Sequence, residues 1–262
     1  MAAKPAAPAA KSYAPVVENP GAMGRFVIVC EHAAHNIPAR WGDLGLNAEQ
    51  RRAHIAWDPG ALGVARGLAQ RLDGVLVHAP VSRVVYDCNR APDMPGAIPV
   101  KSEIHEIPGN AQISAEERLV RAEAIYVPWI SGLQSVIARR LSLGLRPVVV
   151  TVHSFTPVYF GKKRQVEFGI IHDADATLSV AILNAAHRLT RLNAQLNAPY
   201  SAADDVTHTL RLQATPYGLP NVMLEIRSDL IASPDAEEAM AAQLAPVLNM
   251  GLAEIQKQAK AS

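Results

Sequence analysis

The chain has 262 residues, of which 49% are hydrophobic, and its formal net charge is +1. This length and composition suit one α/β domain with a substantial core. A nearly neutral chain offers no field for nucleic acid or an anionic membrane, and no apolar run approaches the ~20 residues that a membrane span needs. Two cysteines, Cys30 and Cys88, are too few for a disulfide framework, so we expect a cytoplasmic location.

The first 24 residues differ in composition from the rest of the chain. They are rich in Ala and Pro, and they show neither an amphipathic period nor the apolar core of a secretory signal. Such a segment buries too little apolar surface to fold. We therefore expect a disordered tail over residues 1–24 and a single domain over residues 25–262, with a processed or docking segment as the alternative for the tail.

Apolar runs, helical spacing and capping residues predict an alternation of strands and helices along most of the chain. Alternation of this kind favours a three-layer αβα sandwich around a mostly parallel, or mixed, central sheet. In chain order, the pattern predicts a strand over 26–30, helices over 47–57 and 58–73, strands over 75–77 and 82–86, a long loop over 91–109, a helix over 114–143, strands over 147–152 and 166–171, a helix over 174–196, an irregular segment over 200–217, a strand over 222–224 and a helix from 234.

Local residues mark several of these boundaries. Asp58 and Pro59 suit the N-cap and first position of a helix. Ser114 and Glu117 form a capping box, and Pro128 is expected to bend the helix that follows. The long loop over 91–109 carries a local crowd of charges, and long loops in compact domains often line a site.

Three of the predicted strands stop at residues that can bind a metal, a proton or a carboxylate. The three segments are Phe26–His32, Pro147–Ser154 and Val222–Arg227. Ligands bind beyond the carboxyl ends of parallel strands, so these groups are expected to meet in one cleft. His32 and His153 are the first candidates as metal ligands, and mixed His/carboxylate sets suit zinc, although they accept other divalent metals.

The third metal ligand is left between two carboxylates, Glu31 and Asp58. Asp58 has an alternative role as the helix cap described above. His35 lies three residues after His32, but the sequence Asn-Ile-Pro that follows predicts a turn, so we interpret His35 as a local loop residue.

Two further groups complete the candidate site. Arg90, in the segment Asp87–Arg90, offers a planar fork for a substrate carboxylate or an oxyanion, and an ion pair with Asp87 is the alternative. Glu225 ends an apolar strand, where a carboxylate is costly unless it is paired or functional. It is a candidate general base, and pairing with Arg227 is the alternative.

These residues resemble three signatures of the zinc carboxypeptidase superfamily. His153 and Ser154 resemble the second zinc histidine with its serine. The segment Asp87–Arg90 resembles the motif with the Asn-Arg pair that binds the substrate carboxylate, and Leu224–Arg227 resembles the motif with the catalytic glutamate. The resemblance implies a zinc carboxypeptidase-like (phosphorylase/hydrolase-like) fold.

The chain is more closely similar to the N-formylglutamate amidohydrolase family. Five stretches match in the same order between about residues 27 and 230, and five in order are far more specific than any one of them. The matching stretches are Val29–Pro38, Asp58–Ala61, Ser82–Arg90, Thr151–Phe155 and Glu225–Arg227.

One departure from the carboxypeptidase pattern concerns the metal ligands. Zinc carboxypeptidases carry His-x-x-Glu after the first strand, and here the fourth position is His35. The resemblance therefore favours Asp58 as the ligand that joins His32 and His153, with Glu31 as the runner-up. Ser154 and a further arginine, which could be Arg83, Arg164 or Arg211, are expected to contact the substrate, the arginine by binding a second carboxylate.

The resemblance implies zinc-dependent hydrolysis of N-formyl-L-glutamate to formate and L-glutamate. Glu225 would be the base, and Asn89 and Arg90 would hold the substrate carboxylate or the oxyanion. The alternatives are the same chemistry on another N-acyl amino acid or a C-terminal peptide bond, and a binding protein without catalysis. A serine nucleophile is disfavoured because Ser154 lacks the Gly-x-Ser-x-Gly turn. The expected partner is a small molecule, and the oligomeric state is left open.

Overall fold

The computed structural model describes residues 12–261, which are built around a central seven-stranded sheet. The strands, in their order across the sheet, are β1 (Val16–Glu18), β3 (Val75–His78), β2 (Phe26–Cys30), β6 (Val148–Phe155), β11 (Asn221–Arg227), β9 (Phe168–Ile171) and β10 (Ala194–Leu196). The four strands β3, β2, β6 and β11 are parallel neighbours. β1 and β9 run antiparallel to β3 and β11, and β10 is parallel to β9. The prediction of a mostly parallel, mixed sheet is confirmed.

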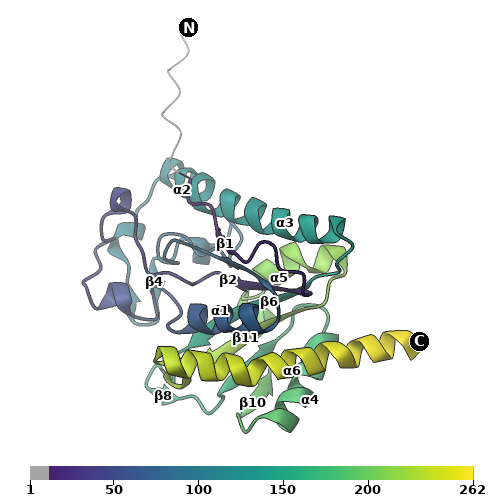
Figure 1. Ribbon diagram of the computed structural model, residues 1–262. Helices are drawn as coiled ribbons and strands as arrows, with labels where there is room; N and C mark the ends of the chain where they lie inside the picture. Colours follow the sequence, from purple (N-terminus) through teal and green to yellow (C-terminus); the bar gives the residue numbers. More distant parts are fainter. Residues whose placement is uncertain (1–11, 262) are drawn as a thin grey trace.

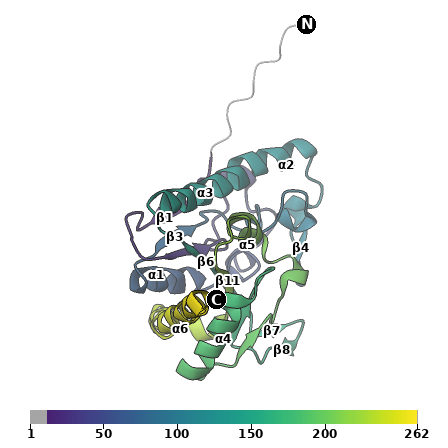
Figure 2. The same cartoon turned by 90° about the vertical axis from the view of Figure 1, so that its right-hand side faces the viewer.

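Helices cover both faces of the sheet, which gives the predicted three layers (Figure 1). One face is covered by α1 (Ala61–Arg71), α4 (Thr177–Leu189) and α6 (Pro234–Ala261), and α6 packs against the other two. The opposite face is covered by α3 (Val127–Ser142) and α5 (His208–Gln213), as the turned view in Figure 2 also shows. α2 (Ala115–Arg121) lies over the neighbouring loops, where Arg121 donates to the carbonyl of Val85 and to the side chain of Asn110. None of the helices within residues 12–261 combines the length and the apolar character that a membrane span requires.

Burial on both faces explains the continuous apolar runs of the central strands. Ile28 packs into the cluster beneath α1, α4 and α6, whereas its neighbours Val27 and Val29 pack into the cluster beneath α3 and α5. Adjacent side chains of a strand point to opposite faces, so a strand covered on both sides is mostly apolar. Thr151 is a buried polar residue in the middle of β6, whereas the site residues His153 and Glu225 lie near the carboxyl ends of β6 and β11.

The loops contain several short hairpins and helical turns. Two short hairpins are β4 (Lys101–Ser102) with β5 (His105–Glu106), and β7 (Val158–Tyr159) with β8 (Lys162–Lys163). The remaining turns are the 3-10 turns η1 (Ala39–Trp41), η2 (Gln50–Arg52), η3 (Pro95–Ala97), η4 (Pro108–Asn110), η6 (Ala202–Asp204), η7 (Thr215–Tyr217) and η8 (Ser228–Ile231), and the π-helical turn η5 (Ala122–Tyr126).

The predicted helix over 114–143 is interrupted rather than simply bent. Ser114 caps α2 by accepting a hydrogen bond from the backbone N–H of Glu117, as predicted. The side chain of Glu117 does not return the bond to the cap, because it accepts from Trp41 and Arg121 instead. The π-helical turn lies just before Pro128, which cannot donate a backbone hydrogen bond to the preceding turn.

The predicted helix over 47–57 is wrong, because only the short turn η2 forms there. Asn47 and Gln50 bond reciprocally through their side chains and backbone amides, which closes a tight turn. The extended backbone of Ala53 then ends it. Local side-chain hydrogen bonds have replaced a helical ladder in this segment.

The predicted strand over 82–86 is also wrong. The Ser82 hydroxyl donates to the carbonyl of Ala56 and accepts from the backbone N–H of Val84. The backbone N–H of Val85 donates to the carbonyl of Ser82, so the segment folds into a turn. A serine that bonds its own backbone in this way competes with strand pairing.

The predicted helix over 174–196 is too long. It ends at Leu189, and Thr190, whose backbone is extended, accepts a hydrogen bond from the N–H of Leu192 through its hydroxyl. The last part of the predicted helix forms the edge strand β10 instead. The segment over 200–217, expected to be irregular, contains the short helix α5.

The expected disordered tail over 1–24 lies partly outside the described residues, which begin at residue 12. Within residues 12–24 the expectation is wrong, because β1 pairs with β3 in antiparallel register, Val17 opposite Val77. Glu18, at the end of β1, accepts hydrogen bonds from Arg66 at 3.0 and 2.8 Å. The prolines on either side of this short edge strand made it difficult to recognise from the sequence.

Candidate active site

The candidate site lies beyond the carboxyl ends of β2, β6 and β11. Parallel pairing places His153 of β6 opposite Glu225 of β11. His32 follows β2, and its carbonyl accepts a hydrogen bond from the backbone N–H of Asp58 at 2.9 Å. This bond holds the loop that carries Asp58 against the end of β2. All four side chains are buried, although they come from four separate segments of the chain.

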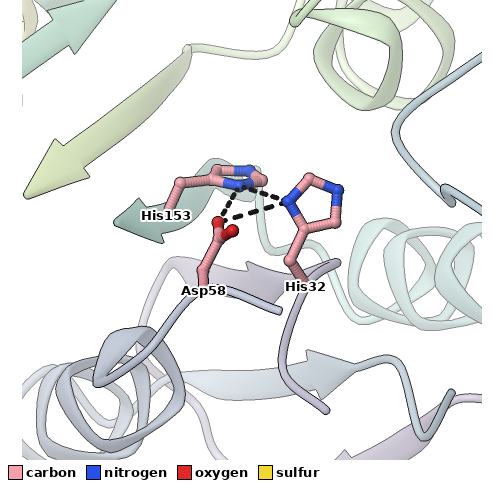
Figure 3. Close-up of side chains that lie close together, drawn as sticks. All are labelled: His32, Asp58 and His153. Carbon is pink, nitrogen blue, oxygen red and sulfur yellow. Dashed lines mark hydrogen bonds and ion pairs between the residues drawn. The ribbon is translucent and has the colours of Figure 1, made fainter. Parts of the chain in front are cut away.

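His32, Asp58 and His153 present three ligand atoms to one point (Figure 3). Oδ2 of Asp58 lies 3.2 Å from Nδ1 of His32 and 2.9 Å from Nδ1 of His153. The two Nδ1 atoms are themselves 3.2 Å apart. Two imidazole nitrogens and one carboxylate oxygen that face one another are the donor set of a three-ligand divalent-metal site.

Asp58 is not the cap of α1, so the alternative role considered for it is wrong. The helix begins at Ala61, and the N-cap position is Gly60, whose backbone is left-handed with φ 79°. A Cβ at this glycine would lie 2.3 Å from the carbonyl oxygen of Ile231. The close approach requires glycine and leaves the Asp58 carboxylate to point into the site.

Each histidine has a second buried carboxylate beside its outer nitrogen, through a hydrogen bond for His32 and through an ion-pair contact for His153. Nε2 of His32 lies 2.8 Å from Oδ1 of Asp87, and Nε2 of His153 lies 3.1 Å from Oε2 of Glu31. Such partners fix the ring orientation and tautomer of a metal-binding histidine and raise its basicity. Glu31 therefore lies behind His153, on the side away from the Asp58 oxygen.

Arg83 connects two of the carboxylates. Its Nη1 lies 3.3 Å from Oδ1 of Asp58, and its Nη2 lies 2.9 Å from Oδ2 of Asp87. The Arg83 side chain is 26% exposed and lines the pocket. A single cation thus neutralises part of the negative charge that the site concentrates.

The buried charges shift one another strongly. Burial alone would lower the pKa of His153, but the neighbouring carboxylates of Glu31 and Asp58 outweigh it and hold the pKa well above its usual value. Burial opposes ionisation of Asp58, but His32 and His153 hold its pKa below the ordinary range. In the absence of a metal, the cluster therefore keeps Asp58 ionised and favours the protonated form of His153.

Glu225 has the opposite environment. Burial, together with the nearby negative charge of Asp58, raises the pKa of Glu225 to about 7. Its Oε2 is buried and has no hydrogen-bond partner among the described residues. The pairing with Arg227 that we considered is wrong, because Arg227 bonds Asp229 at 2.8 Å and Glu167 at 3.4 Å. A carboxylate with a pKa near 7 and a free oxygen is suited to accept a proton.

The pocket at the site is lined by most of the residues that the sequence singled out. The lining includes His32, Asp58, Arg83, Asn89, Arg90, His153, Ser154 and Glu225. Arg90 donates through Nη1 to its neighbour's carbonyl, that of Asn89, and the ion pair to Asp87 comes from Arg83 rather than from Arg90. Arg90 therefore keeps guanidinium donors that no carboxylate occupies among the described residues.

Asn89 and Ser154 are already engaged within the protein. The Asn89 amide donates to the carbonyl of Val206 at 2.6 Å and accepts from the N–H of Thr209 at 3.0 Å. The Ser154 hydroxyl donates to the carbonyl of Pro59 at 2.7 Å. Both side chains tie neighbouring loops to the pocket wall.

The other candidates lie farther from the centre. His35 is exposed and packs edge-on against Trp57, which confirms its interpretation as a loop residue. Arg211 is exposed on α5. Arg164 is not one of the lining residues, but its guanidinium lies over the ring of Tyr159, at 4.3 Å from the centroid. His172 follows β9, which runs antiparallel to β11. It therefore lies at the end of the sheet opposite to the site.

Sequence reasoning missed several lining residues. His54, Ser102, Glu103, Tyr159 and Tyr200 line the pocket and come from loops or hairpins. The cluster of charges within residues 101–106 was the sequence feature that indicated part of this wall. The expectation that the loop over 91–109 lines a site is confirmed for Ser102 and Glu103. The orienting role of Asp87 toward His32 had no signal in the spacing.

Comparisons with known proteins agree with this architecture. The crystal structure of gene product Atu2144 from Agrobacterium tumefaciens is 48% identical and superposes with a TM-score of 0.91, covering 94% of this chain and 97% of that chain. The crystal structure of N-formylglutamate amidohydrolase from Ralstonia eutropha JMP134 is 16% identical with a TM-score of 0.60, covering 95% and 100%, which shows a shared fold. No curated protein matched the chain. A family model described as N-formylglutamate amidohydrolase matches residues 24–232. The chain belongs to the N-formylglutamate amidohydrolase family.

Proposed function

We propose that the protein is a metal-dependent amidohydrolase that removes the acyl group from an N-acylated amino acid, with N-formyl-L-glutamate, hydrolysed to formate and L-glutamate, as the first substrate to test. The observation that carries the proposal is the free, buried Oε2 of Glu225 next to the cluster of His32, Asp58 and His153. A base with an unused oxygen beside a set of metal ligands is the arrangement that amide hydrolysis by water requires.

The residues present fit a divalent metal. His32, Asp58 and His153 would hold it, because their ligand atoms face one another and a carboxylate lies beside the outer nitrogen of each histidine. We propose zinc, which favours histidine nitrogen and carboxylate oxygen. When bound, such a metal supplies Lewis acidity, which polarises a carbonyl group and makes water a better acid.

Glu225 is proposed to move the proton. It would take a proton from the attacking water and pass it to the nitrogen of the leaving amine, acting first as base and then as acid. Burial keeps its proton affinity high, and the cross-strand position opposite His153 keeps its carboxylate at the end of the sheet. No other carboxylate in the lining combines burial with an unbonded oxygen.

Arg90 is proposed to bind the carboxylate of the amino acid or to support the oxyanion, through guanidinium donors that remain free. Asn89 and Ser154 would position the loops around the substrate, since their polar atoms already bond Val206, Thr209 and Pro59. Arg83, which lines the pocket, would hold Asp58 and Asp87 in place through its two Nη atoms.

The test is product release from N-formyl-L-glutamate, with N-acetyl- and N-succinyl-L-glutamate and a dipeptide at equal concentration. Each is assayed with the protein as isolated, after chelation and after zinc is restored. We expect activity on at least one acylated amino acid that is lost and regained with the metal. Hydrolysis of the dipeptide alone would assign peptidase chemistry and contradict the proposal.

The variant Glu225→Gln tests whether Glu225 is the general base or a metal ligand. We expect turnover to fall by at least about a thousandfold while the bound metal stays near the wild-type amount, because the variant keeps the three ligands and removes only the proton acceptor. Metal content is measured by atomic emission on the dialysed protein. Loss of the metal together with activity would show that Glu225 is a ligand or a structural residue.

A further inference from the structure

Two hairpins from distant parts of the chain meet at the pocket through one carboxylate. Glu103 lies in the turn between β4 and β5, and Phe160 lies in the turn between β7 and β8. Oε1 of Glu103 accepts a hydrogen bond from the backbone N–H of Phe160 at 3.0 Å. Oε2 of Glu103 lies 2.9 Å from Nε2 of His54, which follows η2. Glu103 therefore joins three segments, two of which are also linked by the contact of Gln50 Nε2 with His105 Nδ1 at 3.4 Å.

These contacts give the pocket a wall that is distinct from the metal ligands and the base. We call it the outer wall, and it consists of His54, Ser102, Glu103 and Tyr159, all of which line the pocket. The Glu103 side chain is only 13% exposed and both of its oxygens have partners. Its negative charge is therefore fixed in place at the pocket surface.

The pocket holds few cations to balance a second negative charge. Arg83 is shared between the carboxylates of Asp58 and Asp87. Arg90 is the lining arginine for which the described residues provide no ion pair. One arginine without an ion pair matches one substrate carboxylate, the carboxylate that the proposed function assigns to it.

Arg164 does not supply a second cation at the pocket lining for a second substrate carboxylate. Its guanidinium lies over the rings of Tyr159 and Tyr200, at 4.3 and 4.9 Å from their centroids, and its Nη2 donates to the Tyr200 hydroxyl at 2.9 Å. Both tyrosines line the pocket and Arg164 does not. Arg164 therefore acts on the aromatic part of the wall, which it holds by stacking and hydrogen bonding.

We infer that Glu103 is a specificity-determining residue that disfavours a substrate with a second carboxylate. With the amino-acid carboxylate at Arg90 and the amide at the metal ligands, the side chain of the substrate faces the outer wall and the charge of Glu103. The pocket would then prefer an N-acyl amino acid whose side chain is neutral and can donate a hydrogen bond. This inference rests on the proposed function and narrows its substrate class.

The test compares N-formyl-L-glutamine with N-formyl-L-glutamate, which have nearly the same shape and differ by one charge. Like charges a few ångströms apart near a protein surface change an equilibrium by roughly tenfold or more. We expect kcat/KM for the glutamine compound to exceed that for the glutamate compound by about tenfold in the wild-type protein. We expect Glu103→Gln to reduce this ratio by about the same factor.

Glu103→Gln is a conservative probe because glutamine keeps an oxygen for the Phe160 N–H and places an amide beside His54. The matched control is Glu106→Gln on the same hairpin, since Glu106 is paired with Lys101 and does not line the pocket. This control should leave the preference unchanged. A wild-type preference for the glutamate compound, or a ratio that Glu103→Gln does not move, would overturn the inference.

A binding measurement keeps the inference separate from the proposed function. If the zinc-loaded protein hydrolyses neither compound nor any other acylated amino acid, the proposed function is wrong. Titration calorimetry with the same two compounds then decides the inference. Tighter binding of N-formyl-L-glutamine that Glu103→Gln abolishes supports it, and equal or tighter binding of N-formyl-L-glutamate contradicts it.

Discussion

The Nδ1 atoms of His32 and His153 lie 3.2 Å apart, and the same Asp58 oxygen lies within 3.2 Å of both. Their Nε2 atoms point in other directions, toward Asp87 and Glu31. Both rings are therefore clamped between an inner and an outer carboxylate. Inner atoms held this close gain stability from a cation that all three can share.

Asp58→Ala is predicted to abolish metal binding at the site. The variant removes the carboxylate oxygen that faces both Nδ1 atoms, so zinc bound after dialysis should fall from about one per chain to near zero. Activity should fall with it. The measurement is metal content by atomic emission together with product release.

Asp235→Ala is the matched control for this prediction. Asp235 is an exposed aspartate in the first turn of α6, away from the pocket lining. It should keep the metal and the activity of the wild-type protein. An Asp58→Ala protein that retained stoichiometric zinc would show that another residue, with Glu31 as the first to test, is the third ligand.

Asp87→Asn and Glu31→Gln are predicted to weaken metal binding without abolishing it. Each replaces the carboxylate behind one histidine by a neutral amide, which makes the ring less basic and less firmly oriented. Changes to such partners raise the metal Kd by about 10- to 100-fold. Competition with a chromophoric chelator measures this, and an unchanged Kd in both variants would mean that these carboxylates serve only the folding of the loops.

The strand ends were predictable because a strand buried on both faces is mostly apolar, so a group of charged or polar residues after an apolar run indicates that the strand is near its end. His32, His153 and Glu225 follow such runs, so their convergence could be inferred from a parallel sheet alone. The order of the strands supports this, since β2, β6 and β11 are neighbours.

The rest of the site depends on backbone close contacts and loop contacts that leave no periodic pattern. Asp58 looked like a helix cap because nothing in the sequence indicates that Gly60, pressed against Ile231, takes that position. Glu103 reaches the pocket only because its hairpin meets that of Phe160, 57 residues away along the chain. Contacts between loops of this kind follow from tertiary packing rather than from local propensity.

Gly169→Ala is predicted to destabilise the protein and displace the proposed base. Gly169 lies opposite Glu225 in the antiparallel pair of β9 and β11. A Cβ there would lie 2.1 Å from the carbonyl oxygen of Ala198 and 3.1 Å from Cβ of Glu225, and the backbone oxygen cannot move aside cheaply. Overpacking of this kind costs about 1–3 kcal/mol.

Chemical denaturation measures the loss of stability, and kcat on the best substrate reports the displacement of Glu225. Gly21→Ala is the control, because a Cβ at Gly21 meets nothing within 4 Å. The free energy of unfolding of that control should stay within about 0.5 kcal/mol of the wild type. A Gly169→Ala protein as stable and as active as the control would show that the edge of the sheet adjusts freely.

Glu18 is predicted to stabilise the N-terminal edge strand in a pH-dependent way. Its carboxylate accepts three hydrogen bonds from Arg66 and lies 3.0 Å from Nε2 of His78. Hydrogen bonding to Arg66 is the main reason that the pKa of Glu18 is lowered below 4.5. A carboxyl group whose pKa is lower in the folded state adds stability above its unfolded pKa. That stability is lost as the pH falls below about 4.5 through the folded pKa.

Glu18→Gln should therefore lower the free energy of unfolding by about 0.5–1 kcal/mol at pH 7 and by much less at pH 3. Urea denaturation at the two pH values measures this, with Glu123→Gln, at an exposed position of the π-helical turn, as the control. An equal effect of Glu18→Gln at both pH values would mean that the side chain acts through packing rather than through its charge.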